Sequence, residues 1–180
     1  MMPWREIVRL TPRELAGKVR RSIGYRLVNA VNCRRRDRFM QVSPDQYLKI
    51  FSYHQLTGVH VHSICGAQEF YQQILSILSF LRHTGIPETW AIASDGSLTA
   101  AMEKTLKELH PVIQIVPWTN FITDQNRTVV EWYSRKSPMG KKLAVVTGLC
   151  ATQTSVYVDS DILFFPGASH LRELLKARAK

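Results

Sequence analysis

The strongest constraint on the fold is a regular alternation of short β-like runs with helical runs, which begins near residue 58. The β-like runs are rich in apolar and β-branched residues and lie at 59–65, 90–94, 112–116, 155–158 and 162–165. The helical patterns lie at 68–83, 97–110, 124–134, 139–151 and 169–179. Strands that alternate with helices of this length favour right-handed βαβ units and a parallel sheet. We therefore predict an α/β domain with a mostly parallel, Rossmann-like sheet flanked by helices.

The helical predictions rest on apolar residues that recur at the spacing of one helix face. In the first helix, Phe70, Ile74 and Leu81 form such a face, and Gly85 follows as the expected stop. The next helix is expected to begin at Ser97, because serine is a favourable N-cap residue.

The first 44 residues differ from the rest in charge. Residues 1–40 contain eleven Lys and Arg and three acids, a net charge of +8, whereas residues 41–180 have a net charge of +2. Within this segment, apolar residues recur every four positions, which predicts a basic amphipathic helix: Leu15, Val19, Ile23, Leu27 and Val31. Such a helix either contacts an anionic membrane surface or docks on its own domain. We place the domain boundary at the break around Pro44, with segments 1–44 and 45–180.

Composition excludes several classes of protein. Apolar residues make up 45% of the chain and charged residues 21%, which is typical of a globular domain. No apolar run approaches the roughly 20 residues that cross a bilayer, and the first residues lack the apolar core of a secretory signal. The three cysteines form no Cys-x-x-Cys pair, which favours a reducing compartment. We expect a cytoplasmic protein, peripheral to the inner face of a membrane if the basic helix binds lipid. No aromatic platform accompanies the basic residues, so we expect no nucleic-acid partner.

Polar or small residues follow three of the predicted strands. Cys65, Gly66 and Ala67 follow the first, Asp95 follows the second, and Asp159-Ser160-Asp161 follows the fourth. The carboxyl ends of parallel strands share one edge of a sheet, and ligands bind along that edge in open α/β folds. The sequence therefore predicts a ligand site there.

Asp159 and Asp161 are the candidate metal ligands. Residues two apart in an extended chain project to the same side, where two carboxylates repel unless a cation or proton lies between them. Oxygen ligands suit Mg²⁺ or Mn²⁺, and such an ion also binds diphosphate oxygens. An Asp-x-Asp pair also occurs in ordinary solvated turns. The apolar runs 156–158 and 162–165 on either side favour a site.

Three segments resemble GT-A glycosyltransferases, the fold of many nucleotide-diphospho-sugar transferases. "YVDSDILFF" resembles the Asp-x-Asp signature of that family, "AIASDGS" its second-strand turn, and "GKKLAVVTGL" the helix before the Asp-x-Asp strand. The resemblance covers roughly residues 58–170. It implies a GT-A fold and transfer of a sugar from a nucleoside-diphosphate donor, with UDP expected, to an unknown acceptor.

The resemblance also implies roles for individual residues. Asp161 would bind Mn²⁺ or Mg²⁺, Asp159 the metal or the ribose, and Asp95 the base. The remaining donor-binding residues would line the nucleotide pocket or reach the phosphates: Cys65, Gly66, Ala67, Lys141, Lys142 and Ser160. Asp95 also suits a turn at a helix start, and the two lysines also suit a solvated helix face, so these structural alternatives stay open.

The chain ends nineteen residues after Asp161, so we expect the GT-A domain to be incomplete at its C-terminus, and we name no catalytic base. One alternative is a truncated, non-catalytic remnant or binding module of the same fold. Another is a phosphohydrolase of the haloacid-dehalogenase type, with Asp159 as nucleophile, although those enzymes usually continue with Gly-Thr where this chain has Ile162-Leu163.

Overall fold

The computed structural model describes residues 54–150 and 155–178. The chain divides into two units, Met1–Pro44 and Asp45–Lys180, and the fold below belongs to the second. The predicted basic helix and its membrane contact lie outside the described residues. Within the described ranges, no helix is both long enough and apolar enough to cross a membrane.

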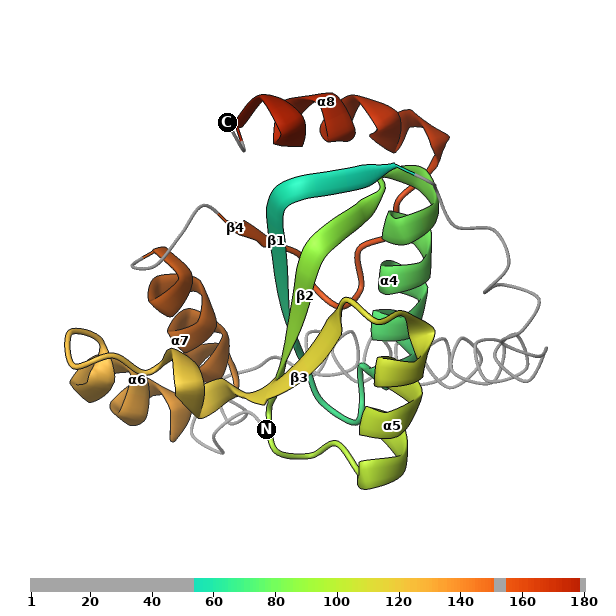
Figure 1. Cartoon of the computed structure of the whole chain (residues 1–180). Coiled ribbons are helices and arrows are strands. Elements are labelled where there is room, and N and C mark those ends of the chain that lie inside the picture. The colour runs from blue at the N-terminus through green and yellow to red at the C-terminus, as the bar shows by residue number, and fades with distance from the viewer. Residues whose placement is uncertain (1–53, 151–154, 179–180) are drawn as a thin grey trace, which may run out of the picture. The chain divides into compact units, whose positions relative to one another are not determined.

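The core of the domain is one parallel sheet. Its strands are β1 (Gln55–Cys65), β2 (Ile86–Ser94), β3 (Ile113–Pro117) and β4 (Ser155–Tyr157), in the order β3-β2-β1-β4 (Figure 1). Each neighbouring pair is parallel, so the four carboxyl ends lie at one edge. This confirms the prediction of an α/β domain with a mostly parallel sheet. The strand order reverses between β1 and β4.

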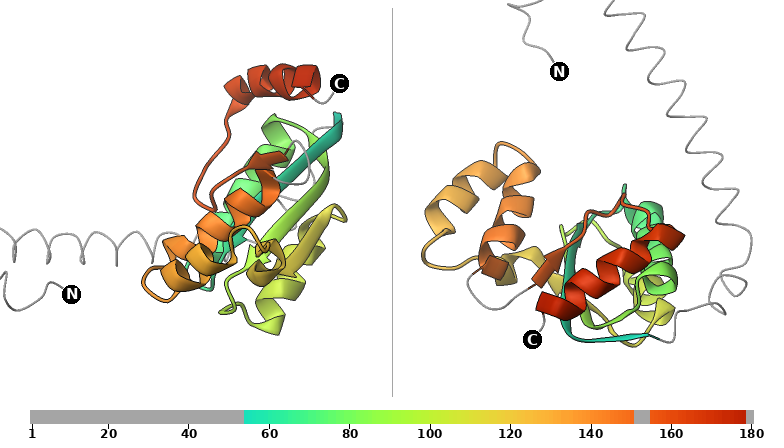
Figure 2. Two further views of the ribbon diagram at one scale, coloured as in Figure 1. Left: turned by 90° about the vertical axis from the view of Figure 1, so that its left-hand side faces the viewer. Right: turned by 90° about the horizontal axis from the view of Figure 1, so that it is seen from above.

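Helices cover both faces of the sheet. They are α4 (Phe70–His83), α5 (Ala100–Leu109), α6 (Arg127–Ser134), α7 (Met139–Cys150) and α8 (Ser169–Arg178), with short 3-10 turns η1 (Trp118–Phe121) and η2 (Pro166–Ala168). Helices α4 and α5 lie on one face, and α7 lies on the other with α6 beside it (Figures 1 and 2). Helix α8 crosses the amino end of the sheet, where Arg172 Nε donates to the carbonyl oxygen of Thr84 at 2.6 Å.

Strand β2 shows how the alternation of side chains builds the two-sided core. Trp90 is fully buried on the α4 side, where its ring meets Phe80 edge-on at 5.1 Å. Its Nε1 donates to Ser63 Oγ on β1 at 3.1 Å, so the one polar atom of the indole is satisfied. Ala93, three positions later, packs on the opposite side against Val145 of α7.

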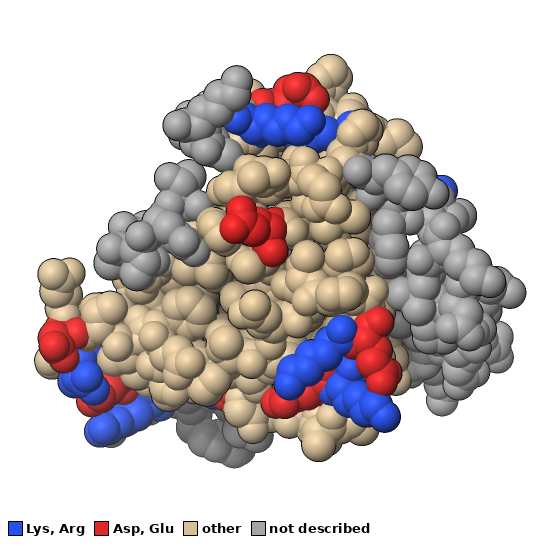
Figure 3. Space-filling view, viewed as in Figure 1, with Lys and Arg blue, Asp and Glu red and all other residues tan. Residues whose placement is uncertain are grey.

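The charged surface of this domain is mixed. On the face drawn in Figure 3, Lys and Arg lie beside Asp and Glu over α5 and α6. The pairs include Lys104–Glu108 on α5 and Arg127–Glu131 on α6, both with a spacing of four residues. Such pairs occupy solvated helix faces and neutralise one another locally.

The predicted cap of the second helix is wrong. The N-cap of helix α5 lies two residues later, at Thr99, whose Oγ1 accepts from the backbone N–H of Met102 at 3.3 Å. Ser97 Oγ instead accepts from the backbone N–H of Ala67 in the loop after β1 and donates to Asp95 Oδ1, so the hydroxyl is not available to the helix.

The predicted fifth strand at 162–165 is also wrong, because this segment is irregular. Its backbone makes a contact that no sheet would provide: the N–H of Phe164 donates to Ser79 Oγ on α4 at 3.1 Å. The Phe164 ring then packs edge-on against Phe80 at 5.0 Å. Anchoring to α4 replaces strand pairing and leaves Phe165 67% exposed.

Candidate functional site

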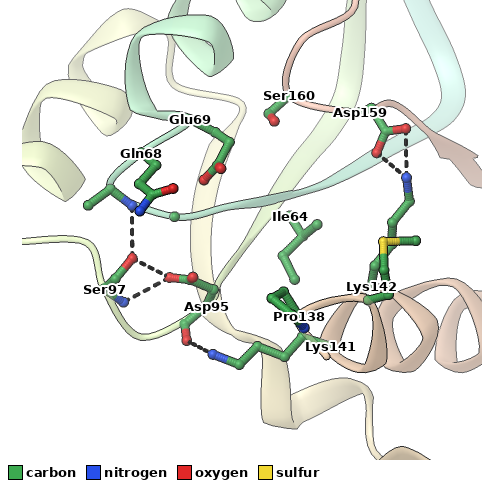
Figure 4. A pocket seen from close by; sticks show the side chains of 13 residues that line it. Ile64, Gln68, Glu69, Asp95, Ser97, Pro138, Lys141, Lys142, Asp159 and Ser160 are labelled. Atoms are coloured by element: carbon green, nitrogen blue, oxygen red, sulfur yellow. Dashed lines mark hydrogen bonds and ion pairs between the residues drawn. The ribbon is translucent and has the colours of Figure 1, made fainter. Parts of the chain in front are cut away.

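A pocket of about 560 Å³ lies at the carboxyl edge of the sheet, beside the point where the strand order reverses. This is where open α/β sheets bind ligands. Its walls come from the loops after β1, β2 and β4 and from the start of α7 (Figure 4). Among the described residues, the lining consists of Ile64, Gly66, Ala67, Gln68, Glu69, Asp95, Ser97, Pro138, Met139, Lys141, Lys142, Asp159 and Ser160.

The loop after β1 requires a glycine for close packing. A Cβ added to Gly66 would lie 2.6 Å from Asp95 Oδ2, nearer than real contacts allow, and 3.0 Å from Ser97 Oγ, which is tighter than most real contacts. A backbone hydrogen bond also joins the loops after β1 and β2: the N–H of Asp95 donates to the carbonyl oxygen of Cys65 at 3.1 Å. Glycine therefore lets the loops after β1 and β2 meet and form one wall.

Asp95 is held by a small hydrogen-bond network. Its Oδ1 accepts from the backbone N–H of Ser97 at 2.8 Å and from Ser97 Oγ at 2.6 Å. Ser97 Oγ accepts in turn from the N–H of Ala67 at 2.8 Å. Gly96 between them has a φ of +95°, which favours glycine. The turn role that the sequence left open for Asp95 is therefore present, and Oδ2 is the carboxylate oxygen without such a bond to Ser97.

Two lysines enter the pocket from the first turn of α7. Lys141 Nζ donates to the backbone carbonyl oxygen of Asp95 at 2.6 Å and lies 5.8 Å from the centre of the Trp118 ring. Lys142 Nζ donates to Asp159 Oδ1 at 2.6 Å and to Oδ2 at 2.7 Å. The helix dipole disfavours cations at an N-terminus, so both ammonium groups depend on these oxygen partners. Neither lysine lies on a solvated face; the Lys142 side chain is 30% exposed.

Asp159 has a second partner besides Lys142. The hydroxyl of Tyr157 donates to Asp159 Oδ1 at 3.0 Å. Burial, reinforced by the Asp159 charge, raises the pKa of Tyr157 well above its usual range, so the hydroxyl stays protonated and keeps donating. The carboxylate is thereby fixed in direction while 40% of the side chain remains exposed toward the pocket side.

Asp161 does not join Asp159 at the pocket. Strand β4 ends at Tyr157, and the chain then turns, with the N–H of Ile162 donating to the carbonyl oxygen of Asp159 at 3.2 Å. The rule that places residues two apart on one side holds only while the chain stays extended. Asp161 is exposed and does not line the pocket, whereas the intervening Ser160 is buried and does.

Cys65 is beside the pocket but contributes no side chain to it. Its side chain is buried, its Sγ donates to the carbonyl oxygen of Gly66 at 3.3 Å, and burial raises the pKa of the thiol to about 12. The thiol is therefore an unreactive core group.

The donor set fits a divalent ion only in part. No cluster of three or more His, Cys, Asp or Glu side chains able to hold a metal occurs within 54–150 and 155–178. Mg²⁺ is usually bound through one or two carboxylates, with phosphate and water completing its shell. Asp159 suits the role of such a single carboxylate, on the condition that Lys142 releases it.

Several lining residues were not singled out from the sequence. They are Ile64, Gln68, Glu69, Pro138 and Met139. Tyr157 was also not singled out; it does not line the pocket but donates a hydrogen bond to Asp159, which does. Tyr157 had a usable signal, since it lies two positions before Asp159 on a predicted strand. Ile64 lies on β1 and Met139 begins α7, whereas the other three lie in connecting segments; none of the five carries such a sequence signal.

No known protein-family model matches this chain, and neither the curated proteins nor the solved structures include a match to it. The geometry of the pocket therefore carries the functional argument.

Proposed function

We propose that this domain binds a nucleoside-diphosphate sugar, with UDP as the nucleotide, and forms the donor-binding portion of a GT-A-type glycosyltransferase. The observation that carries the proposal is the gathering of Gly66, Lys141, Lys142 and Asp159 around one pocket at the strand-order reversal. These groups come from separate segments of the chain. Gly66 lets a ligand approach the backbone closely, the two lysines supply positive charge, and Asp159 supplies a carboxylate.

Each part of the proposed ligand has a matching group. The diphosphate lies against Lys141 and Lys142 at the amino end of α7, where the helix dipole favours an anion. Asp159 offers a carboxylate to Mn²⁺ or Mg²⁺, which would neutralise charge as the nucleoside diphosphate leaves. The base lies toward Asp95. A pocket of about 560 Å³ lies within the usual range of ligand sites, roughly 300–1,000 Å³.

The test is calorimetric titration of UDP into the full 180-residue chain, with and without Mn²⁺. Binding in the micromolar range is expected, tighter with Mn²⁺, and Asp159→Asn should remove the effect of the metal. Asp161→Asn should have the smaller effect, because that side chain lies outside the pocket lining. Glu108→Gln is the matched control, since it also removes one negative charge, from an exposed ion pair on α5. Absence of UDP binding by chain shown to be folded would refute the proposal.

A binding module without turnover is the second candidate. It is favoured by two observations: Lys142 engages both oxygens of Asp159, and Asp161 does not provide a second carboxylate in the pocket. This candidate predicts UDP binding without release of UDP from any UDP-sugar during incubation with Mn²⁺. Chromatographic detection of free UDP above the level of an Asp159→Asn control would exclude it.

A further inference from the structure

The contact between Lys142 and Asp159 occupies the carboxylate that a metal would need. The ammonium lies 2.6 and 2.7 Å from the two oxygens, so it bridges both of them (Figure 4). A divalent ion binds carboxylate oxygen at about 2.0–2.1 Å for Mg²⁺. An ammonium and a divalent ion on the same two oxygens would repel strongly, so Asp159 holds one of them at a time.

We propose that Lys142 is an exchangeable counter-ion: it neutralises Asp159 in the empty pocket and transfers to the donor diphosphate when a divalent ion takes Asp159. This inference rests on the proposed function and adds a coupling between the two ligands. Metal alone must leave the Lys142 ammonium without its carboxylate. Metal together with a diphosphate provides a new anionic partner for it.

The neighbouring residues assign the moving part to Lys142. Lys141, on the same turn of α7, donates to the backbone carbonyl oxygen of Asp95 and does not contact Asp159. Each ammonium also lies near an aromatic ring, at 5.8 Å for Lys141 and 5.3 Å for Lys142, so the contact with Asp159 is what sets Lys142 apart. Tyr157 donates to Asp159 Oδ1 and carries no charge, so it keeps the carboxylate oriented in either state. The Lys142 side chain lies at the pocket wall and is 30% exposed, which leaves it room to turn toward a ligand.

The size of the coupling follows from the exposure of the pair. Because Lys142 and Asp159 are 30% and 40% exposed, solvent screens their attraction, and loss of this attraction should weaken Mn²⁺ binding by about twofold to fivefold. A diphosphate that accepts the ammonium should recover this factor. Thermodynamic reciprocity then requires Mn²⁺ to strengthen UDP binding by the same factor by which UDP strengthens Mn²⁺ binding.

The first experiment measures Mn²⁺ affinity from the electron paramagnetic resonance signal of free Mn²⁺, using the full chain. Lys142→Gln should bind Mn²⁺ about twofold to fivefold more tightly than the wild type in the absence of nucleotide. Lys141→Gln removes the same charge from the same helical turn and should change the affinity less. UDP should increase Mn²⁺ affinity in the wild type, whereas uridine, which lacks the diphosphate, should not. The increase should shrink in Lys142→Gln.

The second experiment follows the lysine ammonium groups directly by ¹H–¹⁵N NMR, with Mg²⁺ as a diamagnetic ion. The Lys142 signal, assigned by its absence in Lys142→Gln, should shift when Mg²⁺ and UDP are added together, while the Lys141 signal changes less. An unmoved Lys142 signal at saturating Mg²⁺ and UDP, or equal Mn²⁺ affinities of the wild type and Lys142→Gln, would overturn the exchange. UDP binding that persists in either case would leave the proposed function standing, so the two failures are distinguishable.

Discussion

Gly66→Ala tests whether the wall of the pocket depends on close packing between the loops after β1 and β2. The new methyl group would lie 2.6 Å from Asp95 Oδ2 and 2.9 Å from its Cγ. The Asp95 side chain must therefore move. Gly66 has no left-handed backbone, so alanine itself fits the local conformation and the cost comes from crowding alone.

The cost can be worked out from the hydrogen bonds that Asp95 would lose. It accepts two from Ser97, and Ser97 accepts one from Ala67, all at 2.6–2.8 Å. These bonds are exposed, so together they contribute at the low end of their range, about 1–2 kcal/mol. An alanine that fits without crowding stabilises by about 0.4–1 kcal/mol, because it restricts the unfolded chain. The net expectation is a loss of about 1 kcal/mol in the free energy of unfolding.

A double-mutant cycle separates crowding from any general effect of the substitution. In an Asp95→Ala background the two nearest atoms are gone, so adding Gly66→Ala should be neutral or slightly stabilising. Urea unfolding, followed by circular dichroism at pH 7.5, gives the four free energies. A coupling of about 1 kcal/mol is expected. If Gly66→Ala costs the same with and without the Asp95 carboxylate, the packing argument is wrong.

Two further predictions concern stability. Burial, reinforced by the charge of His60, lowers the pKa of His62 to about 4, so the neutral ring is favoured in the folded state. Its contribution is complete above pH 6.5, the unfolded value, and is lost as pH falls toward 4, by up to about 3 kcal/mol. Urea unfolding at pH 7.5 and 4.5 should show a smaller acid loss in His62→Gln than in the wild type; equal losses would contradict this. Gly140→Ala would place a methyl group against the backbone nitrogen of Ser134, which cannot yield easily, so a loss of about 2 kcal/mol is expected. Gly167→Ala, with no atom within 4 Å of the added carbon, is the control and should change stability little in the same unfolding assay.

Periodic segments of this chain could be predicted from sequence because the burial of one apolar face dominates the structure of each segment. The apolar face of 68–83 buries Ile74, Ile77 and Leu81 in α4, as its spacing requires. The segment 162–165 shows the limit of this approach. An apolar run of four residues suits a strand, but here Phe164 packs against Phe80 of α4, a contact between residues far apart in sequence.

The cap of α5 was mispredicted for a related reason. Ser97 and Thr99 are both able to cap a helix, and local sequence does not rank them. The backbone N–H of Ala67, thirty residues earlier, donates to Ser97 Oγ and thereby commits Ser97 to the pocket wall. Thr99 is then the residue whose hydroxyl remains for the helix.

The separation of Asp159 from Asp161 is likewise set by contacts between residues far apart in sequence, and it affects the proposed metal site. Whether two alternate residues share a side depends on how far the strand extends, and among the described residues the register of β4 with β1 ends at Tyr157. Beyond that point the N–H of Val158 donates to the backbone carbonyl oxygen of His62, and the chain then turns. A sequence pattern cannot show where pairing stops, because the stop depends on the partner strand. It also cannot show that Lys142, seventeen residues earlier, reaches the Asp159 oxygens. The charge that balances Asp159 is therefore a lysine before any ligand binds. An ion that binds there must displace this lysine as well as its own water, which makes metal affinity depend on what the pocket offers to Lys142.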